Sequence, residues 1–143
     1  MGKVMVTRNN RWLVVSVLVL TLLVLGACGK NKDKKEKVLY NQITMDQAKK
    51  MMKVDDGHVI VDVREQKEYD EGHIPKAINI PSDSIGTEKP SQLPDTDQVI
   101  LIYCRSGKKS KEVAMKLYKM GYTNIYEFEA FIDWDGEIEK TVK

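Results

Sequence analysis

Short apolar runs alternate with amphipathic and polar stretches from about residue 38 to the end of the chain. The runs have the length of strands, and the most apolar of them are typical of strands buried on both faces of a parallel sheet. They occupy residues 38–40, 59–63, 77–81, 99–103 and 124–128. Because helical patterns lie between strands, the sequence predicts an α/β fold with right-handed crossovers, in which helices flank a small parallel β-sheet on both faces.

Three segments have helical features. Thr44 and Gln47 stand three residues apart, as the two ends of a capping box do, and the apolar positions that follow have helical spacing. A polar segment at residues 65–71 predicts a short helical link. After the 99–103 run, apolar residues at near-helical spacing lead to Gly121, a favourable residue just past a helix C-terminus. A short amphipathic segment near the end of the chain contains Phe131, Ile132 and Trp134, of which the two aromatic residues are expected to pack in the core.

The first 28 residues have the pattern of a secretory signal. Three basic residues are followed by an apolar run over residues 12–25, which is short for a full membrane span. The run ends in Leu25-Gly26-Ala27-Cys28, which resembles the lipobox of bacterial lipoproteins, whose cysteine is lipidated and becomes the mature N-terminus. We therefore expect a signal peptide, a lipid anchor on Cys28 and an extracytoplasmic protein held at the bacterial cell membrane. An uncleaved anchor helix is the alternative.

The composition changes abruptly after Cys28. Residues 29–37 are polar and highly charged, which predicts a flexible tether ahead of a folded domain over residues 38–143. The whole chain has 23 basic and 21 acidic residues, but three of the basic residues and none of the acidic ones lie in the first 28. The rest of the chain therefore has a net charge of −1, which does not favour nucleic-acid binding.

Cys104 lies where the most apolar run of the predicted domain ends and a helical pattern begins. Ligands bind at the carboxyl ends of parallel strands, and a helix that begins there presents free N–H groups and the positive end of its dipole. Both effects favour a thiolate and attract an anion. The intervening loop adds the basic side chains of Arg105, Lys108 and Lys109. The pattern predicts a reactive cysteine in an anion-binding loop; a buried, inert cysteine is the alternative.

Three stretches together resemble the rhodanese family of sulfurtransferases. The segment Cys104-Arg105-Ser106-Gly107-Lys108-Lys109-Ser110 is similar to the active-site loop of the family. Val61-Asp62-Val63-Arg64 is similar to its D-x-R strand end, and residues 72–81 are close to its G-H-I-P-x-A-x-N-I-P motif. The order and spacing of the three stretches also match, and the resemblance spans about residues 40–140.

The resemblance implies that Cys104 carries sulfur as a persulfide. The thiolate attacks the outer sulfur of a donor such as thiosulfate, sulfite leaves, and the sulfane sulfur passes to cyanide or a thiol. Asp62 and Arg64 are implied to support the loop. The residues implied to bind the anionic donor are Arg105, Ser106, Gly107, Lys108, Lys109 and Ser110. No cofactor is expected, and we expect a monomer.

Two positions depart from the family pattern. Lys109 stands where many active members have arginine or threonine, and lysine lacks the planar fork that suits an oxyanion. We therefore expect a lower efficiency with thiosulfate, with persulfide chemistry retained. Glu129-Ala130 replaces a Gly-Gly pair that often precedes the last helix of the family.

Several polar residues also have purely structural interpretations. Asp62 is equally compatible with a helix cap, and Arg64 is expected to form a surface ion pair. His73 is expected to hold the turn in its Gly-His-Ile-Pro stretch, and His58 to be a loop residue. Two isolated histidines and one thiol in the predicted mature domain do not favour a metal site.

Three other functions remain open from the sequence. A phosphatase or arsenate reductase on the same fold needs an arginine at the seventh loop position, where this chain has Ser110. A non-catalytic sulfur-binding or interaction module usually lacks the cysteine that is present here. A thiol-redox role is compatible with Cys104, which has no disulfide partner in its own chain if Cys28 is lipidated.

Overall fold

The computed structural model describes residues 39–128 and 131–141. The predicted signal peptide, the tether, Cys28 and the Glu129-Ala130 pair lie outside the described residues. Among the helices in these two ranges, none has the length and apolar character needed to cross a bilayer.

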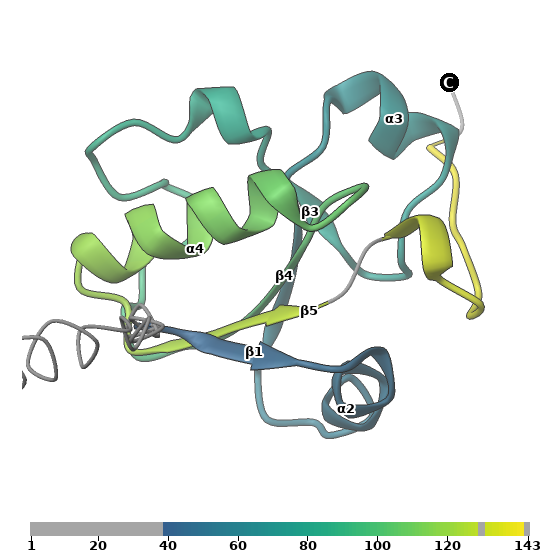
Figure 1. The fold of residues 1–143 in the computed structure, drawn as a ribbon, viewed down its shortest axis with the longest axis horizontal. Coiled ribbons are helices and arrows are strands. Elements are labelled where there is room, and N and C mark those ends of the chain that lie inside the picture. The colour runs from purple at the N-terminus through teal and green to yellow at the C-terminus, as the bar shows by residue number, and fades with distance from the viewer. Residues whose placement is uncertain (1–38, 129–130, 142–143) are drawn as a thin grey trace, which may run out of the picture. The chain divides into compact units, whose positions relative to one another are not determined.

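Five parallel strands form the central sheet of the domain (Figure 1). In spatial order they are β1 (Asn41–Ile43), β5 (Asn124–Phe128), β4 (Val99–Tyr103), β2 (Val59–Asp62) and β3 (Ile78–Asn79). The strand β4 lies in the middle, where it pairs with β2 through Asp62 and Tyr103 and with β5 through Ile102 and Glu127. The carboxyl ends of β2, β4 and β5 therefore meet at one edge of the sheet, which is where parallel sheets bind ligands.

Helices cover both faces of the sheet, as the sequence predicted. The helix α4 (Lys108–Lys119) lies on one face and α2 (Met45–Met51) on the other (Figure 1). The remaining short elements are α3 (Gln66–Glu71) and the 3-10 turns η1 (Ser82–Ser84) and η2 (Phe131–Asp133).

Both predicted helix-end signals are confirmed. The Thr44 side chain accepts a hydrogen bond from the backbone N–H of Gln47, and the Gln47 side chain accepts one from the backbone N–H of Thr44, so the capping box is present. Gly121 follows the C-cap residue Met120 with a φ of 95°, a left-handed conformation that a glycine adopts without strain.

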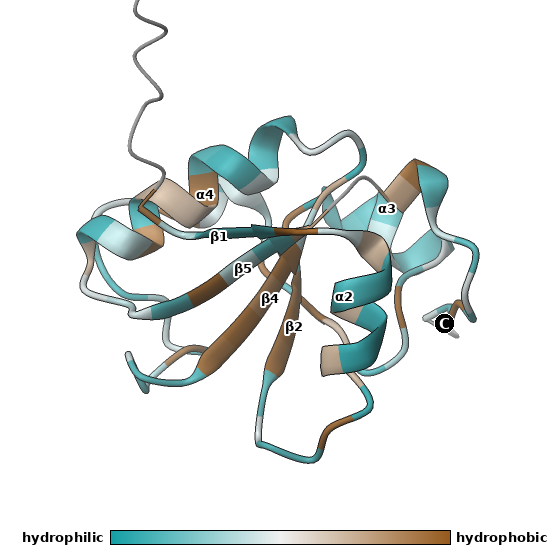
Figure 2. Ribbon diagram, turned by 60° about the horizontal axis from the view of Figure 1, so that its bottom comes forward, coloured by the Kyte–Doolittle hydropathy of each residue, from teal (hydrophilic) through white to brown (hydrophobic). Residues whose placement is uncertain are grey.

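The core consists of two apolar clusters, one on each face of the sheet. Alternate residues of β4 supply both, because Ile100 and Ile102 join the cluster under α4, and Leu101 and Tyr103 join the cluster under α2. Cys104 continues the alternation and belongs to the α4-side cluster. The strands β2 and β4 are mainly hydrophobic, whereas much of α2 is hydrophilic (Figure 2).

The predicted first strand is in the wrong place. Leu39 and Tyr40 form a bend, and the strand is Asn41–Ile43, which pairs with residues 126–128 of β5. The strand lies at the sheet edge, where Asn41 and Gln42 are exposed, so its position does not require apolar side chains. Hydropathy alone therefore favoured the more apolar residues just before it.

Candidate active site

Cys104 lies directly after the central strand, at the carboxyl edge of the sheet. The strand β4 ends at Tyr103, and α4 begins four residues after Cys104, at Lys108. The N-cap of α4 is Gly107, whose φ of 79° lies in the left-handed region. This conformation turns the loop tightly enough for the first N–H groups of the helix to point back at the cysteine. Cys104 is 2% exposed.

Three groups of the loop contact the sulfur atom. The backbone N–H of Gly107 lies 3.1 Å from Cys104 Sγ, and the backbone N–H of Ser110 lies 3.3 Å from it. The Ser110 hydroxyl lies 3.4 Å from the same sulfur. N–H donors that converge on one atom stabilise a negative charge there, so the loop is built to hold anionic sulfur.

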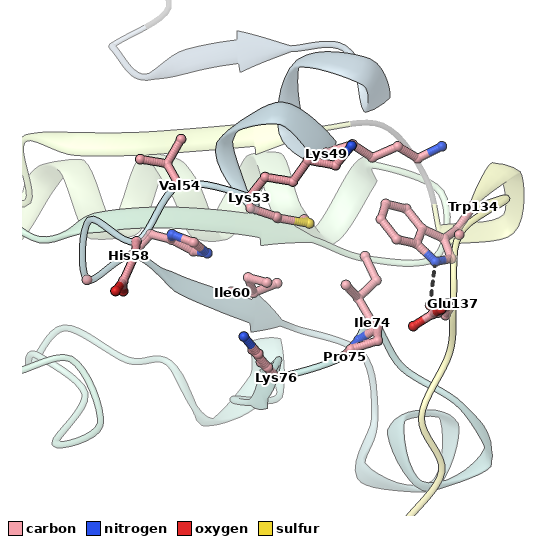
Figure 3. A pocket seen from close by; sticks show the side chains of 14 residues that line it. Lys49, Lys53, Val54, His58, Ile60, Ile74, Pro75, Lys76, Trp134 and Glu137 are labelled. Carbon is pink, nitrogen blue, oxygen red and sulfur yellow. Dashed lines mark hydrogen bonds between the residues drawn. The ribbon is translucent and has the colours of Figure 1, made fainter.

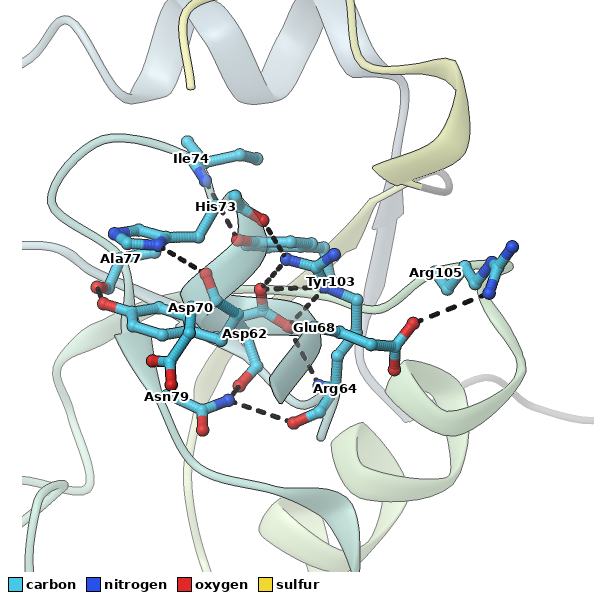
Figure 4. Close-up of polar contacts among 12 residues, drawn as sticks. Asp62, Arg64, Glu68, Asp70, His73, Ile74, Ala77, Asn79, Tyr103 and Arg105 are labelled. Carbon is cyan, nitrogen blue, oxygen red and sulfur yellow. Dashed lines mark hydrogen bonds and ion pairs between the residues drawn. The ribbon is translucent and has the colours of Figure 1, made fainter. Parts of the chain in front are cut away.

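Two basic side chains beside the cysteine, Lys109 and Arg105, meet carboxylates from the segment around α3. Lys109 Nζ lies 2.8 Å from Glu65 Oε1, and this hydrogen bond raises the pKa of Lys109. Arg105, whose side chain is 71% exposed, lies 3.7 Å from Glu68 Oε1 (Figure 4). Lys108 and Ser106 are exposed. The predicted donor-binding residues thus lie on the loop and on the first turn of α4, where Gly107 and Ser110 contact the sulfur. The charged residues Arg105, Lys108 and Lys109 form the outer rim.

A buried acid that sequence reasoning missed lies beside the loop. Glu127 of β5 is 3% exposed, and its Oε1 accepts a hydrogen bond of 2.7 Å from the Ser110 hydroxyl. Because side chains alternate along a strand, Glu127 shares a face with the buried Ile125. That alternation was a usable signal, since an acidic residue at a core-facing position of a strand is rare unless it has a partner.

Asp62 and Arg64 form a buried pair next to the site (Figure 4). Arg64 Nη2 lies 2.6 Å from Asp62 Oδ2, and Arg64 Nε lies 2.9 Å from the same oxygen. Arg64 is only 5% exposed and also donates a bond of 2.7 Å to the carbonyl oxygen of Gly72. Burial alone lowers the pKa of Arg64, but the hydrogen bonds and charge of Asp62 outweigh burial and raise it.

The expectation for Arg64 is therefore wrong, and the helix-cap alternative for Asp62 is excluded. Arg64 does not form a surface ion pair, because its guanidinium lies over the ring of Phe131, 3.9 Å from the ring centroid, and is covered from solvent. Asp62 does not cap a helix, since its carboxylate accepts bonds from the side chain and the backbone N–H of Arg64. The Asp62 carboxylate at the end of β2 instead binds the backbone N–H and the guanidinium of Arg64, two residues later in the chain.

The structural interpretations of the histidines are confirmed. His73 Nδ1 lies 2.8 Å from the carbonyl oxygen of Tyr69, and its ring stacks on the Tyr69 ring at 3.7 Å between centroids. His58 lies in a loop, with Nδ1 2.7 Å from Asp56 Oδ1. Over the two described ranges, no group of three or more His, Cys, Asp or Glu side chains is placed to hold a metal ion.

A groove lies on the other side of the sheet. Lys49, Lys53 and Lys76 surround an apolar floor that includes Ile60 and Ile74 (Figure 3). These apolar residues belong to the α2-side cluster, whereas Cys104 belongs to the α4-side cluster. Trp134 borders the groove and, like Phe131, packs against the α2-side cluster as expected. The groove is therefore separate from the cysteine loop.

Comparison with known proteins assigns this arrangement to a family. A model of the rhodanese-like domain matches residues 44–134. The putative sulfur carrier protein YrkF of Bacillus subtilis (strain 168) is 29% identical over 99 residues, which make up 68% of this chain and 52% of YrkF. The thiosulfate sulfurtransferase PspE of Escherichia coli (strain K12) is 32% identical over 65 residues, 46% of this chain and 62% of PspE.

A solved structure shows the same fold. The rhodanese-like domain protein from Staphylococcus aureus matches with a TM-score of 0.61 and 28% identity, over 71% of this chain and 99% of that protein. The chain spans between half and two thirds of the length of YrkF and PspE, so what those proteins do as a whole is not carried over with the fold. The matched domain, the parallel sheet and the cysteine loop at its carboxyl edge show that this chain belongs to the rhodanese family.

Proposed function

We propose that this chain is a sulfurtransferase in which Cys104 carries a sulfane sulfur as a persulfide. The observation that carries the proposal is the convergence of the Gly107 and Ser110 N–H groups on Cys104 Sγ, at 3.1 and 3.3 Å. The thiolate attacks the outer sulfur of a donor such as thiosulfate and forms a new S–S bond. The old S–S bond breaks, and sulfite leaves with its electron pair. Cyanide or a thiolate then attacks the outer sulfur of the persulfide and regenerates the Cys104 thiolate.

The same loop geometry suits both steps. A nucleophilic thiolate is needed first, and it must leave again as a thiolate in the second step, so donors that stabilise anionic sulfur assist both. Arg105, Lys108 and Lys109 place three positive charges beside the loop, partly offset by Glu68 and Glu65, and attract an anionic donor. PspE, a relative in the same family, is named a thiosulfate sulfurtransferase, which supports thiosulfate as the donor to test first.

Turnover tests this proposal. The full chain carrying Cys28→Ser, purified in detergent, is incubated with thiosulfate and cyanide, and thiocyanate is measured. We expect steady formation of thiocyanate by this protein. The variant that carries Cys104→Ala in addition to Cys28→Ser should form none above background. Equal thiocyanate formation by both proteins would contradict a role for Cys104.

We also propose that Cys28 anchors the protein at the outer side of the bacterial cell membrane. The support is the residue order Leu25-Gly26-Ala27-Cys28 at the end of an apolar run. Two acyl chains on one residue hold a protein stably on a bilayer. When the full chain is expressed in a bacterium that is supplied with a labelled fatty acid, we expect the protein to carry the label and to be found in the membrane fraction. Equal labelling of the Cys28→Ala variant would contradict lipidation at this residue.

A further inference from the structure

Glu127 occupies a place in the core that the fold would ordinarily give to an apolar residue. Its side chain lies on the α4 face of β5, the face that buries Ile125. Its register neighbours are Ile102 on β4 and Gln42 on β1, neither of which is charged. A carboxyl group this deeply buried is costly unless it is hydrogen-bonded or holds a proton, so its position needs a physical reason.

One hydroxyl group connects this acid to the cysteine. The Ser110 hydroxyl lies 2.7 Å from Glu127 Oε1 and 3.4 Å from Cys104 Sγ. Ser110 is fully buried, and Cys104 and Glu127 are 2% and 3% exposed, so bulk water does not separate the three groups. A hydroxyl has one proton to donate and lone pairs to accept with. When it donates to the carboxylate, its oxygen is free to accept the thiol proton.

We propose that Glu127 is a positioning residue that takes up the proton of Cys104 through Ser110. The S–H bond breaks and its proton passes to Ser110 Oγ, while the original hydroxyl proton passes to Glu127 Oε1. The products are a thiolate, an unchanged hydroxyl group and a neutral carboxylic acid, with no oxidation or reduction. The Ser110 hydroxyl then donates to the thiolate, which the N–H groups of Gly107 and Ser110 already face.

Electrostatics favours one negative charge on this chain of groups over two. Two acidic groups that share a buried site do not both ionise readily, because each charge opposes the other in a medium of low dielectric constant. The first turn of α4 favours one anion at its N-terminus. Among the described residues, the charged groups around the site include the ammonium of Lys111 from α4 and the rim pairs Lys109–Glu65 and Arg105–Glu68. Lys111 Nζ and Glu127 Oε1 both lie within 4.0 Å of the position that a Cβ on Gly107 would take.

The inference rests on the proposed function only in that an activated Cys104 is useful for sulfur transfer. Its test uses alkylation of the thiol by iodoacetamide, which needs no sulfur donor. The result therefore stands whether or not the chain transfers sulfur. The protein is the full chain with Cys28→Ser, in which Cys104 is the remaining cysteine.

We expect two steps when the alkylation rate is followed against pH. Two coupled acids lose their protons in two macroscopic steps. After the first step the two groups share one proton, and in part of the molecules this proton lies on Glu127 while Cys104 is a thiolate. After the second step Cys104 is a thiolate in every molecule. Glu127→Gln cannot accept a proton and should show one step. Ser110→Ala breaks the connection, and the rate on the lower plateau should fall about tenfold, the change that one unit in a titration midpoint brings.

The matched control is Glu112→Gln, which removes an exposed carboxylate from α4 and should retain both steps. A single step in the unsubstituted protein, or two steps in Glu127→Gln, would overturn the proposal. Infrared spectroscopy gives a second test that needs no variant, in case Glu127→Gln does not fold. A protonated-carboxyl band should persist on the lower plateau and disappear along the upper step. A Glu127 that is ionised throughout would show no such band and would also overturn the proposal.

Discussion

The backbone N–H of Phe131 donates a hydrogen bond of 2.9 Å to the carbonyl oxygen of Cys104. The ring of the same residue lies under the guanidinium of Arg64, at 3.9 Å from its centroid. Phe131 thus connects the buried Asp62–Arg64 pair to the first residue of the cysteine loop. The pair and the loop are far apart in sequence, yet a change in one is expected to reach the other through Phe131.

Replacing Arg64 with leucine should destabilise the domain strongly. The change leaves the Asp62 carboxylate buried without its partner, and breaking a buried ion pair in this way costs about 3 kcal/mol or more in the free energy of unfolding. Urea unfolding measures the loss. The matched control is Arg105→Leu, because the Arg105–Glu68 pair is exposed and is expected to contribute less than about 1 kcal/mol. Equal losses of unfolding free energy in the two variants would show that burial of the Asp62–Arg64 pair does not increase its contribution to stability.

Much of the fold was predictable because local signals and tertiary structure agree. Residues Thr44 and Gln47 form the capping box that their spacing predicts, and Cys104 lies between a strand and a helix as expected. The first strand was misplaced because an edge strand does not need apolar residues. Local sequence patterns predicted the features that depend on interactions between residues close together in the sequence.

The rest of the site depends on contacts between distant residues. Arg64 was expected at the surface because arginine usually lies there, and the ring that covers it belongs to Phe131, 67 positions later in the chain. Glu127 drew no attention because its partner Ser110 lies on another element. Alternation in β5 places Glu127 on the buried face, but only the packing of α4 on that face brings it to the loop.

Gly107→Ala should reduce activity more than stability alone explains. An alanine at φ 79° is strained by about 1 kcal/mol, and relief of that strain would turn the Gly107 N–H away from the sulfur. Gly57→Ala is the matched control, because Gly57 has a φ of 76° and an added Cβ there meets nothing within 4 Å. Thermal unfolding should show similar losses in both variants, whereas thiocyanate formation should fall only in Gly107→Ala. Unchanged activity in Gly107→Ala would argue against a role for this N–H.

Lys109→Arg should improve the use of thiosulfate. Arginine has a planar fork that binds two oxygens of an oxyanion at once, whereas lysine presents a compact charge. We expect KM for thiosulfate to fall severalfold with a smaller change in kcat, as measured by steady-state kinetics. Lys119→Arg makes the same exchange in the last turn of α4 and should leave KM unchanged. If Lys109→Arg leaves KM where it was, side-chain shape at this position is not what limits donor binding.

Lys109 should remain charged through the neutral and mildly alkaline range. The protonated amine makes the hydrogen bond to Glu65, and this raises the pKa of Lys109 above its ordinary value of 10.5. The contribution of protonated Lys109 to the stability of the fold is therefore fully present below pH 10.5. It is lost as the pH rises through the raised pKa that Lys109 has in the folded protein. Carbon-13 NMR of the labelled lysine measures the titration, which should move to lower pH in Glu65→Ala. An identical titration in both proteins would mean that the contact does not persist in solution.

The most direct test of sulfur transfer by Cys104 is the intact mass of the protein after incubation with thiosulfate and removal of excess donor. The protein is the full chain with Cys28→Ser, so that the added mass can be assigned to one residue. We predict a gain equal to one sulfur atom, loss of that gain on addition of cyanide, and no gain in the Cys104→Ala variant. An unchanged mass in a folded protein whose cysteine still reacts with iodoacetamide would contradict persulfide formation from thiosulfate.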